Sequence, residues 1–356
     1  MFSADRIEIE FLSRYNRPRL IPCRAHVAPG GFLLNFIMRV FPLTAAALLC
    51  AAALSANAAD RFDSLTASGA LSAGVDVTHL VRSSVDARLT QARVNDRTDG
   101  GSLWLDVAGA KTRAEKLTGD AGYKATVGVA NLGADIQTGT HSFGVVYFYG
   151  EGDFDTVKTE HRDGDAAYYG VMIYGEERLG DAALSGKLGW TRMKNGVDTP
   201  TGHVYGMDGN LFTADVTANY RVRTPWLDIV PHAGVEATFI NADNWSDGSS
   251  YGEPDNAALY EFPVGVTLTT ARAPGAYSVR PTLDVTYAAA AGDKTLKGKI
   301  NGSASETKYF EDGRVKVTAG LAATGEKGTL GLLYRFEAAE HDRENHSLTL
   351  QGKYVF

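Results

Sequence analysis

The densest group of titratable side chains lies near the C-terminus, at residues 340–346, with the sequence EHDRENH. A histidine beside a carboxylate can act as a general base, because the carboxylate orients the imidazole ring. Catalysis would also need a nucleophile, and none is spaced near this segment in a pattern typical of hydrolases. We therefore interpret residues 340–346 as a solvated hairpin loop of mixed charge, and we expect no catalytic residues and no enzymatic activity.

Other candidate ligand groups are sparse. Glu160 and His161 are adjacent, but one histidine and one carboxylate are too few ligands for a metal site, and we interpret them as part of a solvated loop. Downstream of residue 58 the sequence contains no Gly-rich phosphate loop, no zinc-ligand spacing and no EF-hand pattern. We therefore expect no metal and no cofactor.

A second set of charged residues lies within segments in which apolar and polar residues alternate. In a closed membrane barrel, the polar face of such segments lines a wet lumen. The charges either hold a helix inside the barrel and set pore selectivity, or they are simply hydrated. We favour the first interpretation, because an upstream polar segment supplies Arg82, Asp86, Arg88 and Arg93, although specific pairs cannot be assigned from sequence. The set comprises Lys187, Asp215, Arg221, Glu236, Arg280, Asp284, Lys316 and Arg335.

The C-terminal segment shows the alternation most clearly. Leu348, Leu350, Tyr354 and Phe356 fall on one face of a strand, because successive side chains point to opposite faces. An apolar face that ends at the terminal carboxylate is awkward in a soluble protein and natural for a strand bordering lipid. Similar segments recur, and we predict twelve strands, at 102–110, 121–137, 141–151, 166–178, 182–194, 209–222, 226–241, 258–271, 276–290, 307–324, 329–339 and 345–356.

The connections between the predicted strands alternate in length. A soluble sandwich has no reason to sort its loops in this way, whereas a membrane barrel has short periplasmic turns and long surface loops. We therefore expect an all-β fold, a twelve-stranded antiparallel transmembrane β-barrel whose long loops face outward. The predicted long loops are residues 111–120, 152–165, 195–208, 242–257, 291–306 and 340–344.

The N-terminal part of the chain contains a second apparent start. Met38 and Arg39 precede an apolar run that ends at Leu54, and the following small residues predict signal-peptide cleavage between Ala58 and Ala59. The apolar run of ~14 residues is shorter than the ~20 that a membrane-spanning helix needs. We interpret residues 38–58 as a signal peptide and residues 1–37 as an over-extended N-terminus, with an extended signal region as the alternative.

The segment between the cleavage site and the first strand has a different character. It begins with small residues and continues at 77–97 as a polar helix, in which Val81, Val85 and Leu89 are spaced four apart. Such a helix could lie on the periplasmic rim or be threaded through the barrel. We assign residues 59–98 to a short linker and this helix, and residues 99–356 to the barrel domain.

The charge balance narrows the possible partners. After removal of residues 1–58, the chain has 298 residues, with 29 Lys and Arg against 39 Asp and Glu, a net charge of −10. An acidic chain with no basic cluster is a poor nucleic-acid binder. Both cysteines, Cys23 and Cys50, lie in the removed part, which fits passage through an oxidising compartment.

Several motifs, taken in order, resemble the autotransporter β-domain, the translocator of type V secretion in Gram-negative bacteria. The resemblance covers about residues 78 to 356. The motifs are Asp86-Ala-Arg88-Leu89 on the helix, the Gly-Gly-x-x-Trp104 opening of the first strand, Gly122-Tyr123, Leu132-Gly-Ala-Asp135, Tyr169-Gly170, Val230-Pro231 with Gly234 and Glu236, Phe262 with Gly265, Val279-Arg-Pro281 with Asp284 and Tyr287, and the ending Tyr354-Val-Phe356.

This resemblance carries specific expectations. In the family a helix occupies the pore of a twelve-stranded barrel, and the domain carries an N-terminal passenger to the cell surface. Leu348, Leu350, Tyr354 and Phe356 would form the C-terminal signal read by the barrel-assembly machinery. The implied partners are this machinery, periplasmic chaperones, outer-membrane lipid and lipopolysaccharide, but no nucleic acid. We expect a monomer in the outer membrane, after signal-peptide-directed export.

The chain departs from the family at its passenger. Only residues 59–78 lie between the signal and the expected helix, and no passenger motif occurs there. The helix has Asn95 followed by Asp96 rather than an Asn-Asn pair, so the family's cleavage inside the barrel is not carried over. We expect a translocator barrel whose passenger is missing, minimal or encoded elsewhere. The alternative is a stand-alone barrel that acts as a surface adhesin or pore through its extracellular loops.

Overall fold

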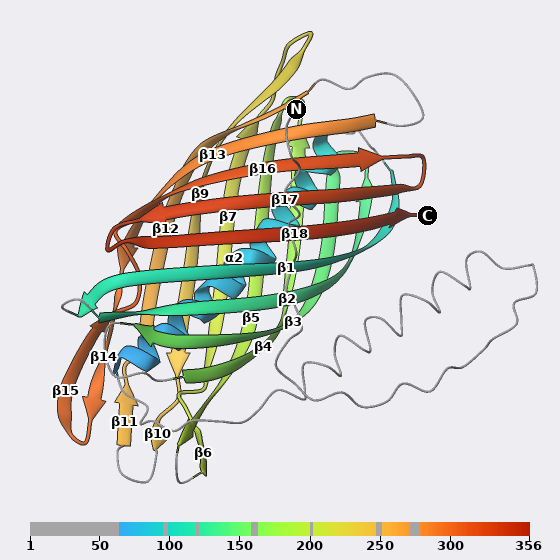
Figure 1. Ribbon diagram of the computed structural model, residues 1–356. Helices are drawn as coiled ribbons and strands as arrows, with labels where there is room; N and C mark the ends of the chain where they lie inside the picture. The colour runs from blue at the N-terminus through green and yellow to red at the C-terminus, as the bar shows by residue number, and fades with distance from the viewer. Residues whose placement is uncertain are drawn as a thin grey trace, which may run out of the picture. The chain divides into compact units, whose positions relative to one another are not determined.

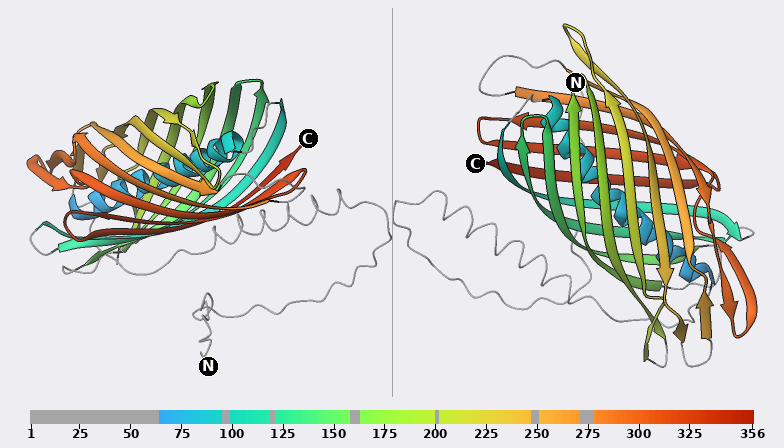
Figure 2. Two further views of the ribbon diagram at one scale, coloured as in Figure 1. Left: turned by 90° about the horizontal axis from the view of Figure 1, so that it is seen from above. Right: turned by 180° about the vertical axis from the view of Figure 1, so that it is seen from behind.

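A closed barrel surrounds one long helix. The computed structural model describes residues 64–94, 99–118, 121–157, 163–199, 202–246, 251–270 and 278–356. All of them lie in one compact unit, Ala56–Phe356. Within them, long antiparallel strands wrap around the helix α2 (Ser64–Val94), as Figures 1 and 2 show. The predicted all-β barrel with an N-terminal helix is confirmed.

Each barrel strand pairs with the next, and the pairing of the last strand with the first closes the circle. β18 pairs with β1 from Ser102 opposite Val355 to Arg113 opposite Glu344. The pairing of β12 with β9 joins the two halves of the wall. The barrel strands are β1 (Asp99–Thr118), β2 (Ala121–Thr138), β3 (His141–Val157), β4 (Asp163–Leu179), β5 (Ala182–Thr199), β7 (Gly209–Tyr220), β9 (Leu227–Ala242), β12 (Ala257–Thr270), β13 (Ser278–Gly292), β16 (Gly313–Thr324), β17 (Gly328–Ala339) and β18 (Arg343–Val355).

The two ends of the barrel differ in their connections. At one end, which we call the turn end, short turns join β2 to β3 and β4 to β5. Gly139 and Gly180 adopt φ values of 56° and 68° in these turns, a region that favours glycine because it has no Cβ. The opposite end, which we call the loop end, carries the longer connections. β1 starts at the turn end, and β18 ends there beside it.

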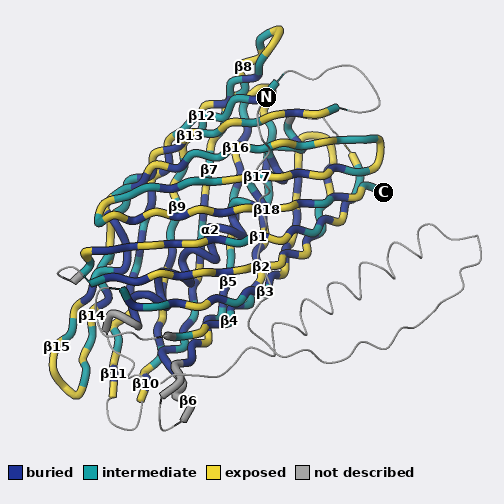
Figure 3. The backbone as a smooth tube through the Cα atoms, viewed as in Figure 1, coloured by how far each residue is buried: buried dark blue, intermediate teal, exposed yellow. Residues whose placement is uncertain are grey.

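Side chains alternate between the lumen and the outer surface. On β2, buried and exposed residues alternate along most of the strand. The outward residues include Leu132 and Ile136, both more than half exposed at 57%, whereas the inward Asn131 is fully buried. Figure 3 shows the same alternation around the wall, with α2 buried inside it. The core of this unit is therefore the lumen, filled by α2 and by inward polar and aromatic side chains.

The helix begins at Ser64, earlier than the predicted start at Val77. The additional turns carry small residues, including Ala67, Ala70 and Ala73, all of them buried. Small side chains let the helix approach the wall: a Cβ on Gly69 would lie 3.4 Å from the Tyr123 ring. Among the described residues, no helix is both long and apolar enough to cross a membrane.

The loop end carries more regular structure than the sequence predicts. The barrel strands β1, β3 and β5 continue through parts of the predicted loops 111–120, 152–165 and 195–208. Residues predicted as the loops 242–257 and 291–306 contribute to a separate four-stranded sheet, in the order β10-β11-β14-β15. Its strands are β10 (Trp245–Ser246), β11 (Tyr251–Pro254), β14 (Thr295–Ile300) and β15 (Ser303–Lys308), and the two remaining short strands are β6 (Gly202–Tyr205) and β8 (Val222–Arg223).

One predicted strand, 307–324, is divided in two. β15 ends at Lys308 and β16 begins at Gly313, so the predicted start at 307 is wrong. Three of the residues between them turn inward: Tyr309, Phe310 and Glu311 are buried. The Phe310 ring lies 5.2 Å from the Arg314 guanidinium, a cation–π contact that favours this inward path over a straight strand.

Candidate functional site

The helix α2 runs through the lumen from the loop end to the turn end. Near its start, Ser68 donates a hydrogen bond to the carbonyl of Thr307 on β15 at 3.5 Å. Near its end, Arg88 binds Asp135, which stands close to the turn that follows β2. Five sets of polar contacts along this path fix the depth and rotation of the helix.

The first set lies near the loop end, around Asp76. The Arg343 guanidinium of β18 is 2.8 Å from one Asp76 oxygen, and the Thr112 hydroxyl of β1 donates to the other at 2.7 Å. Arg343 also donates to Ser72 at 2.8 Å and to the hydroxyl of Tyr123. The expectation that residues 340–346 form a solvated loop is therefore wrong for Arg343, which is buried because it neutralises a helix carboxylate.

The second set surrounds His79. Its Nε2 atom is 2.7 Å from a Glu261 oxygen, and Arg314 donates to the other Glu261 oxygen at 2.6 Å. Arg314 also pairs with Glu337 at 3.0 Å. Phe310 covers the set from the loop end, with its ring centroid 6.2 Å from that of His79. All four polar side chains are buried, and each carboxylate has a cationic partner.

The third set joins Arg82 and Asp86 of the helix to β5, β7 and β9. Arg82 is 3.0 Å from Asp215 and 3.4 Å from Glu236, and it donates to the carbonyl of Ala237 at 3.2 Å. The Lys187 ammonium lies 2.9 Å from Asp86 and 3.8 Å from Asp215. The structure thus brings three predicted lumen charges, Lys187, Asp215 and Glu236, onto two predicted helix charges.

The fourth set anchors Arg88 near the turn end. Its guanidinium makes a bidentate pair with Asp135, with distances of 2.7 Å from Nε and 2.6 Å from Nη2. Ser102 of β1 donates to Asp135 at 2.6 Å, and Tyr174 of β4 donates at 3.1 Å. The Trp104 indole donates in turn to the Tyr174 hydroxyl at 2.9 Å. Bidentate geometry with a fully occupied carboxylate makes this a directional, rigid contact.

The fifth set holds the last turn of the helix. Arg93 pairs with Glu176 of β4. Arg221 donates to the backbone carbonyl of Arg93 at 3.2 Å and pairs with Asp228 at 2.7 Å. A cation at a helix C-terminus is also favoured by the unpaired carbonyls there. Arg221, predicted to face the lumen, therefore contacts the helix end.

The remaining predicted lumen charges lie on the wall opposite the fourth set. Arg335 donates to Thr318 at 3.2 Å and to Ser83 of the helix. Asp284 accepts from Thr267 at 2.7 Å and from Thr286 at 2.8 Å, so it is held by the wall rather than by the helix. Arg280 and Lys316 are also buried in the lumen. Of the predicted lumen charges, Lys187, Asp215 and Glu236 form ion pairs with charged residues of the helix.

A cavity of about 190 Å³ separates the C-terminal half of the helix from this wall. Thr90 of the helix, His232 of β9, Thr282 of β13, Lys316 of β16 and Arg335 of β17 contribute to its lining. A lining of hydroxyls and charges suits water. The helix therefore packs closely on β1 to β4 and leaves a polar gap on the other side.

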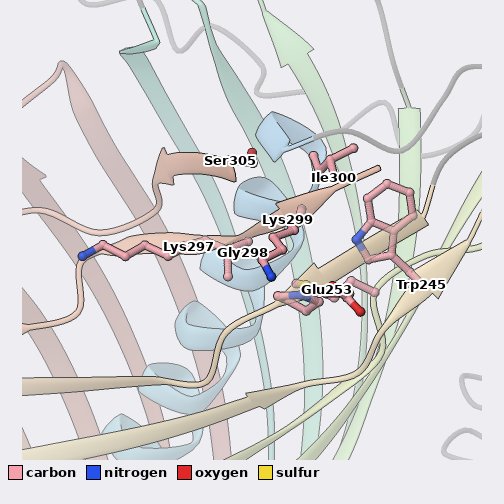
Figure 4. Close-up of a pocket in the computed structure, with 11 residues that line it drawn as sticks. Trp245, Glu253, Lys297, Gly298, Lys299, Ile300 and Ser305 are labelled. Carbon is pink, nitrogen blue, oxygen red and sulfur yellow. The ribbon is translucent and has the colours of Figure 1, made fainter. Parts of the chain in front are cut away.

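A second, much smaller cavity lies at the loop end, where the four-stranded sheet covers the start of the helix. Trp245, Ile300 and Ser305 line it, as Figure 4 shows in close-up. Ala67 of α2 also contributes to the lining. Its volume of about 20 Å³ suits roughly one water molecule. It offers no room for a ligand between helix and sheet.

Two groups of side chains have the composition of metal ligands. Arg82 and Arg314 already neutralise the carboxylates of the first group, and Lys308 lies 3.0 Å from Glu311 in the second. A resident ammonium or guanidinium takes the place that a cation would fill, so we assign no metal to either group. The groups are His79, Glu236 and Glu261 in the lumen, and Glu311, Glu340 and His341 at the loop end.

The residues of the predicted C-terminal signal point away from the lumen. Leu348, Leu350, Tyr354 and Phe356 are all exposed on the outer surface of β18 or just beyond it. Phe356 donates its backbone N–H to the carbonyl of Gly101 at 3.2 Å. Its ring also covers Gly101, where an added Cβ would lie 2.6 Å away, so the terminal residue closes the seam between β18 and β1.

Several residues that hold the helix were not predicted from the sequence, although the positions of three of them indicate that they face the lumen or the same side of the helix as predicted residues. Arg314 and Glu337 lie two residues from Lys316 and Arg335 and therefore share the lumen face of the same strands. His79 lies three residues before Arg82, on the same helix face. The other missed residues are Asp76, Asp135, Glu176, Glu261 and Arg343.

Comparison with known proteins agrees with this geometry. The family model for the autotransporter β-domain matches residues 103–334. The transport unit of the autotransporter AIDA-I from Escherichia coli has a TM-score of 0.59 at 14% identity, over 72% of this chain and 90% of that one. The translocator domain of the autotransporter NalP from Neisseria meningitidis has a TM-score of 0.59 at 16% identity, over 79% and 98%.

A third solved structure, the β-domain of the Bordetella autotransporter Brka, has a TM-score of 0.53 at 16% identity, over 72% of this chain and all (100%) of that one. At such identities, the likeness to solved structures concerns the fold. None of the curated proteins compared with the chain matches it. The family model, however, spans nearly the whole barrel. The chain belongs to the autotransporter β-domain family.

Proposed function

We propose that this chain is the outer-membrane translocator barrel of an autotransporter, in which α2 fills the lumen and the chain upstream of α2 emerges at the cell surface. The observation that carries the proposal is the path of α2, which enters the lumen at the loop end and leaves it at the turn end. A helix in this position is expected when the residues upstream of it have passed through the pore.

The outer surface of the barrel supports a location in lipid. Large apolar side chains are exposed on strand after strand, among them Val107, Leu132, Phe143, Leu188 and Leu350. A continuous apolar belt on a closed barrel, with polar side chains inside, is typical of a transmembrane β-barrel. We accordingly place the protein in the outer membrane of a Gram-negative cell, as a monomer exported through its signal peptide, with the barrel-assembly machinery and periplasmic chaperones as partners.

A reporter tests transport directly. A small epitope-tagged domain inserted after Ala59 should become accessible to antibody on intact cells, because the barrel would carry it outward. The same reporter attached to residues 38–59 alone should stay in the periplasm. A heat-dependent shift in gel mobility would identify folded barrels. A reporter that remains periplasmic although the barrels are folded contradicts the proposal.

The alternative function is a stand-alone barrel that binds surface ligands through its loops. The four-stranded sheet at the loop end is the observation that favours it, because such a sheet presents a defined surface. An open pore is disfavoured by the helix in the lumen. Removal of β14 and β15 distinguishes the two functions: surface display of the reporter should persist in a translocator, whereas adhesion would be lost in an adhesin.

A further inference from the structure

The chain contains the dipeptide Asn-Gly twice, at Asn195-Gly196 and at Asn301-Gly302. In this dipeptide the asparagine carboxamide is open to attack by the next backbone nitrogen, because glycine has no side chain to hinder that nitrogen. The structure places the two copies in opposite surroundings. The first is buried in a strand of the barrel wall, and the second is an exposed turn.

The exposed copy joins β14 to β15 at the loop end, in the hairpin that Figures 1 and 3 show. Asn301 and Gly302 have φ values of 51° and 77°, as expected for the two central residues of a type I′ hairpin turn. Both residues are exposed, and so is Ser303 after them. A Cβ added to Gly302 would meet nothing within 4 Å, so the turn is open to water and has space in which to twist.

The backbone of Tyr251, at the start of β11, contacts Asn301 twice. The Tyr251 N–H donates to the Oδ1 atom of Asn301 at 2.8 Å, and the Tyr251 carbonyl accepts from the Asn301 N–H at 2.8 Å. When a nucleophile attacks the carboxamide carbon, negative charge develops on Oδ1. A backbone N–H that already points at this oxygen stabilises the charge, as the donors of an oxyanion hole do.

The buried copy has the same functional groups but no freedom to rearrange. Asn195 lies in β5 with an exposed fraction of 3%, and its side-chain nitrogen donates to the carbonyl of Met207. Gly196 is paired with Asp165 of β4 on one side and with Tyr205 of β6 on the other. Ring closure at Asn195 would therefore require this part of the wall to unfold.

We propose that Asn301 is a self-modification site, which deamidates through a cyclic imide while Asn195 stays intact. The Gly302 nitrogen forms a bond to the Asn301 Cγ atom, the Cγ–Nδ2 bond breaks, and ammonia leaves with the proton of the Gly302 N–H. Water then opens the imide ring at either of its carbonyl groups. One product is aspartate, and the other is isoaspartate, in which the main chain runs through Cγ.

Isoaspartate changes the loop-end sheet as well as its charge. The main chain gains a carbon atom within a turn of only two residues, which disturbs the pairing of Ile300 with Ser303 across the hairpin. The same change displaces the two hydrogen bonds to Tyr251, which join β11 to β14 where Gly252 pairs with Ile300. We therefore expect the junction of β11 and β14 to loosen, and the loop end to gain a negative charge.

The test stores the full, folded barrel in detergent in a mildly alkaline buffer and samples it over time. Peptide mapping by mass spectrometry measures the deamidation of each asparagine, and an isoaspartyl methyltransferase detects isoaspartate. Asn301 should convert at least several-fold faster than Asn195. In barrel unfolded by denaturant the two rates should be similar, because both copies then lie in an open chain. Equal rates in the folded barrel, or no conversion of Asn301, would overturn the site.

A first variant tests the role of the glycine nitrogen. Gly302→Asp introduces a residue that tolerates the left-handed conformation, and its Cβ fits into open space. This variant should convert Asn301 several-fold more slowly, because the new Cβ hinders the attacking nitrogen. Unchanged conversion in folded Gly302→Asp barrel, identified by its gel mobility shift, would contradict attack by Gly302.

A second variant tests the effect on the sheet. Asn301→Gly removes the carboxamide and keeps a residue that tolerates positive φ. Trypsin cleavage after the exposed Lys299 should become faster with storage in the unmodified protein, whereas in Asn301→Gly it should not change with storage. An equal change in both proteins would contradict loosening of the sheet by deamidation.

Discussion

At the scale of single residues, inward aromatic side chains fit the barrel wall because glycine stands beside them. A Cβ added to Gly133 would lie only 2.1 Å from the Trp104 ring. One added to Gly144 would lie only 2.3 Å from the Tyr174 ring. Both rings also carry the hydrogen-bond chain that ends at Asp135. These glycines therefore make room for the contacts that hold Arg88.

Two substitutions on β2 distinguish the steric effect of the Trp104 ring from the general effect of replacing a glycine. Gly133→Ala should lower the free energy of unfolding by about 1–3 kcal/mol, the usual cost of overpacking. Gly128→Ala should not lower it, because its Cβ would lie in open space. Denaturant unfolding of both variants in detergent micelles checks the prediction, and equal effects would show that the Trp104 contact is unimportant.

Removal of one member of a buried charge pair should destabilise the barrel more than removal of one member of an exposed pair. Arg88→Leu leaves Asp135 buried without its cation and should destabilise the protein by about 3–5 kcal/mol. As a control, Arg223→Leu removes one side of an exposed pair with Asp181, 3.1 Å apart, and should cost about 1 kcal/mol or less. Unfolding free energies measured in the same detergent compare the two, and similar losses would refute the anchoring role of Arg88.

The charged residues could be assigned to the lumen from sequence because alternation determines their face. Lys187, Asp215 and Glu236 follow this rule and meet the helix. Their partners could not be assigned, because alternation contains no information on how far the helix is inserted or how it is rotated. That depends on all five sets of contacts together.

At the scale of elements, α2 is unusual in being buried although it is polar. A surface helix of a soluble protein buries one apolar stripe against the core, whereas α2 is surrounded by a wall that itself presents polar groups. The turns before Val77 were missed for this reason: Ala67, Ala70 and Ala73 offer no apolar stripe, and their value lies in small size. Only the diameter of the lumen makes small residues favourable there.

Removal of the helix tests whether it obstructs the pore. Deletion of residues 64–94 should raise the single-channel conductance in planar bilayers several-fold, because the lumen would then be open from end to end. Lys297→Gln/Lys299→Gln serves as the control, since both side chains lie in the loop-end sheet. Unchanged conductance in folded, helix-free barrels would contradict the plug.

The last strand gives a further prediction. Phe356→Ser should reduce the amount of barrel in the outer membrane several-fold, because the family resemblance assigns this residue to the assembly signal and its ring covers the β18–β1 seam at Gly101. Trp226→Ser removes another highly exposed aromatic residue, at 86%, and should leave membrane levels unchanged. Normal levels of Phe356→Ser in membrane fractions would count against the signal.

At the scale of the whole barrel, the sorted connections made the fold predictable. Short turns and long loops alternate, and strand number, order and approximate bounds followed from this pattern and from period-two alternation. The loop-end sheet could not be predicted, because β14 and β15 are joined by the turn Asn301-Gly302 within a stretch whose composition resembles an ordinary polar loop. Its fold depends on contacts with β11 and with the start of α2.

The proposed translocator function requires that the chain enters the lumen from outside, at the loop end. The most direct measurement is labelling of single cysteines with a membrane-impermeant maleimide on intact cells, after Cys23 and Cys50 are replaced by serine. Asp63→Cys, just before α2, should be labelled as readily as Ser303→Cys at the loop end, whereas Thr140→Cys at the turn end should react only after the outer membrane is permeabilised. Labelling of Asp63→Cys only after permeabilisation would contradict entry of the chain from outside.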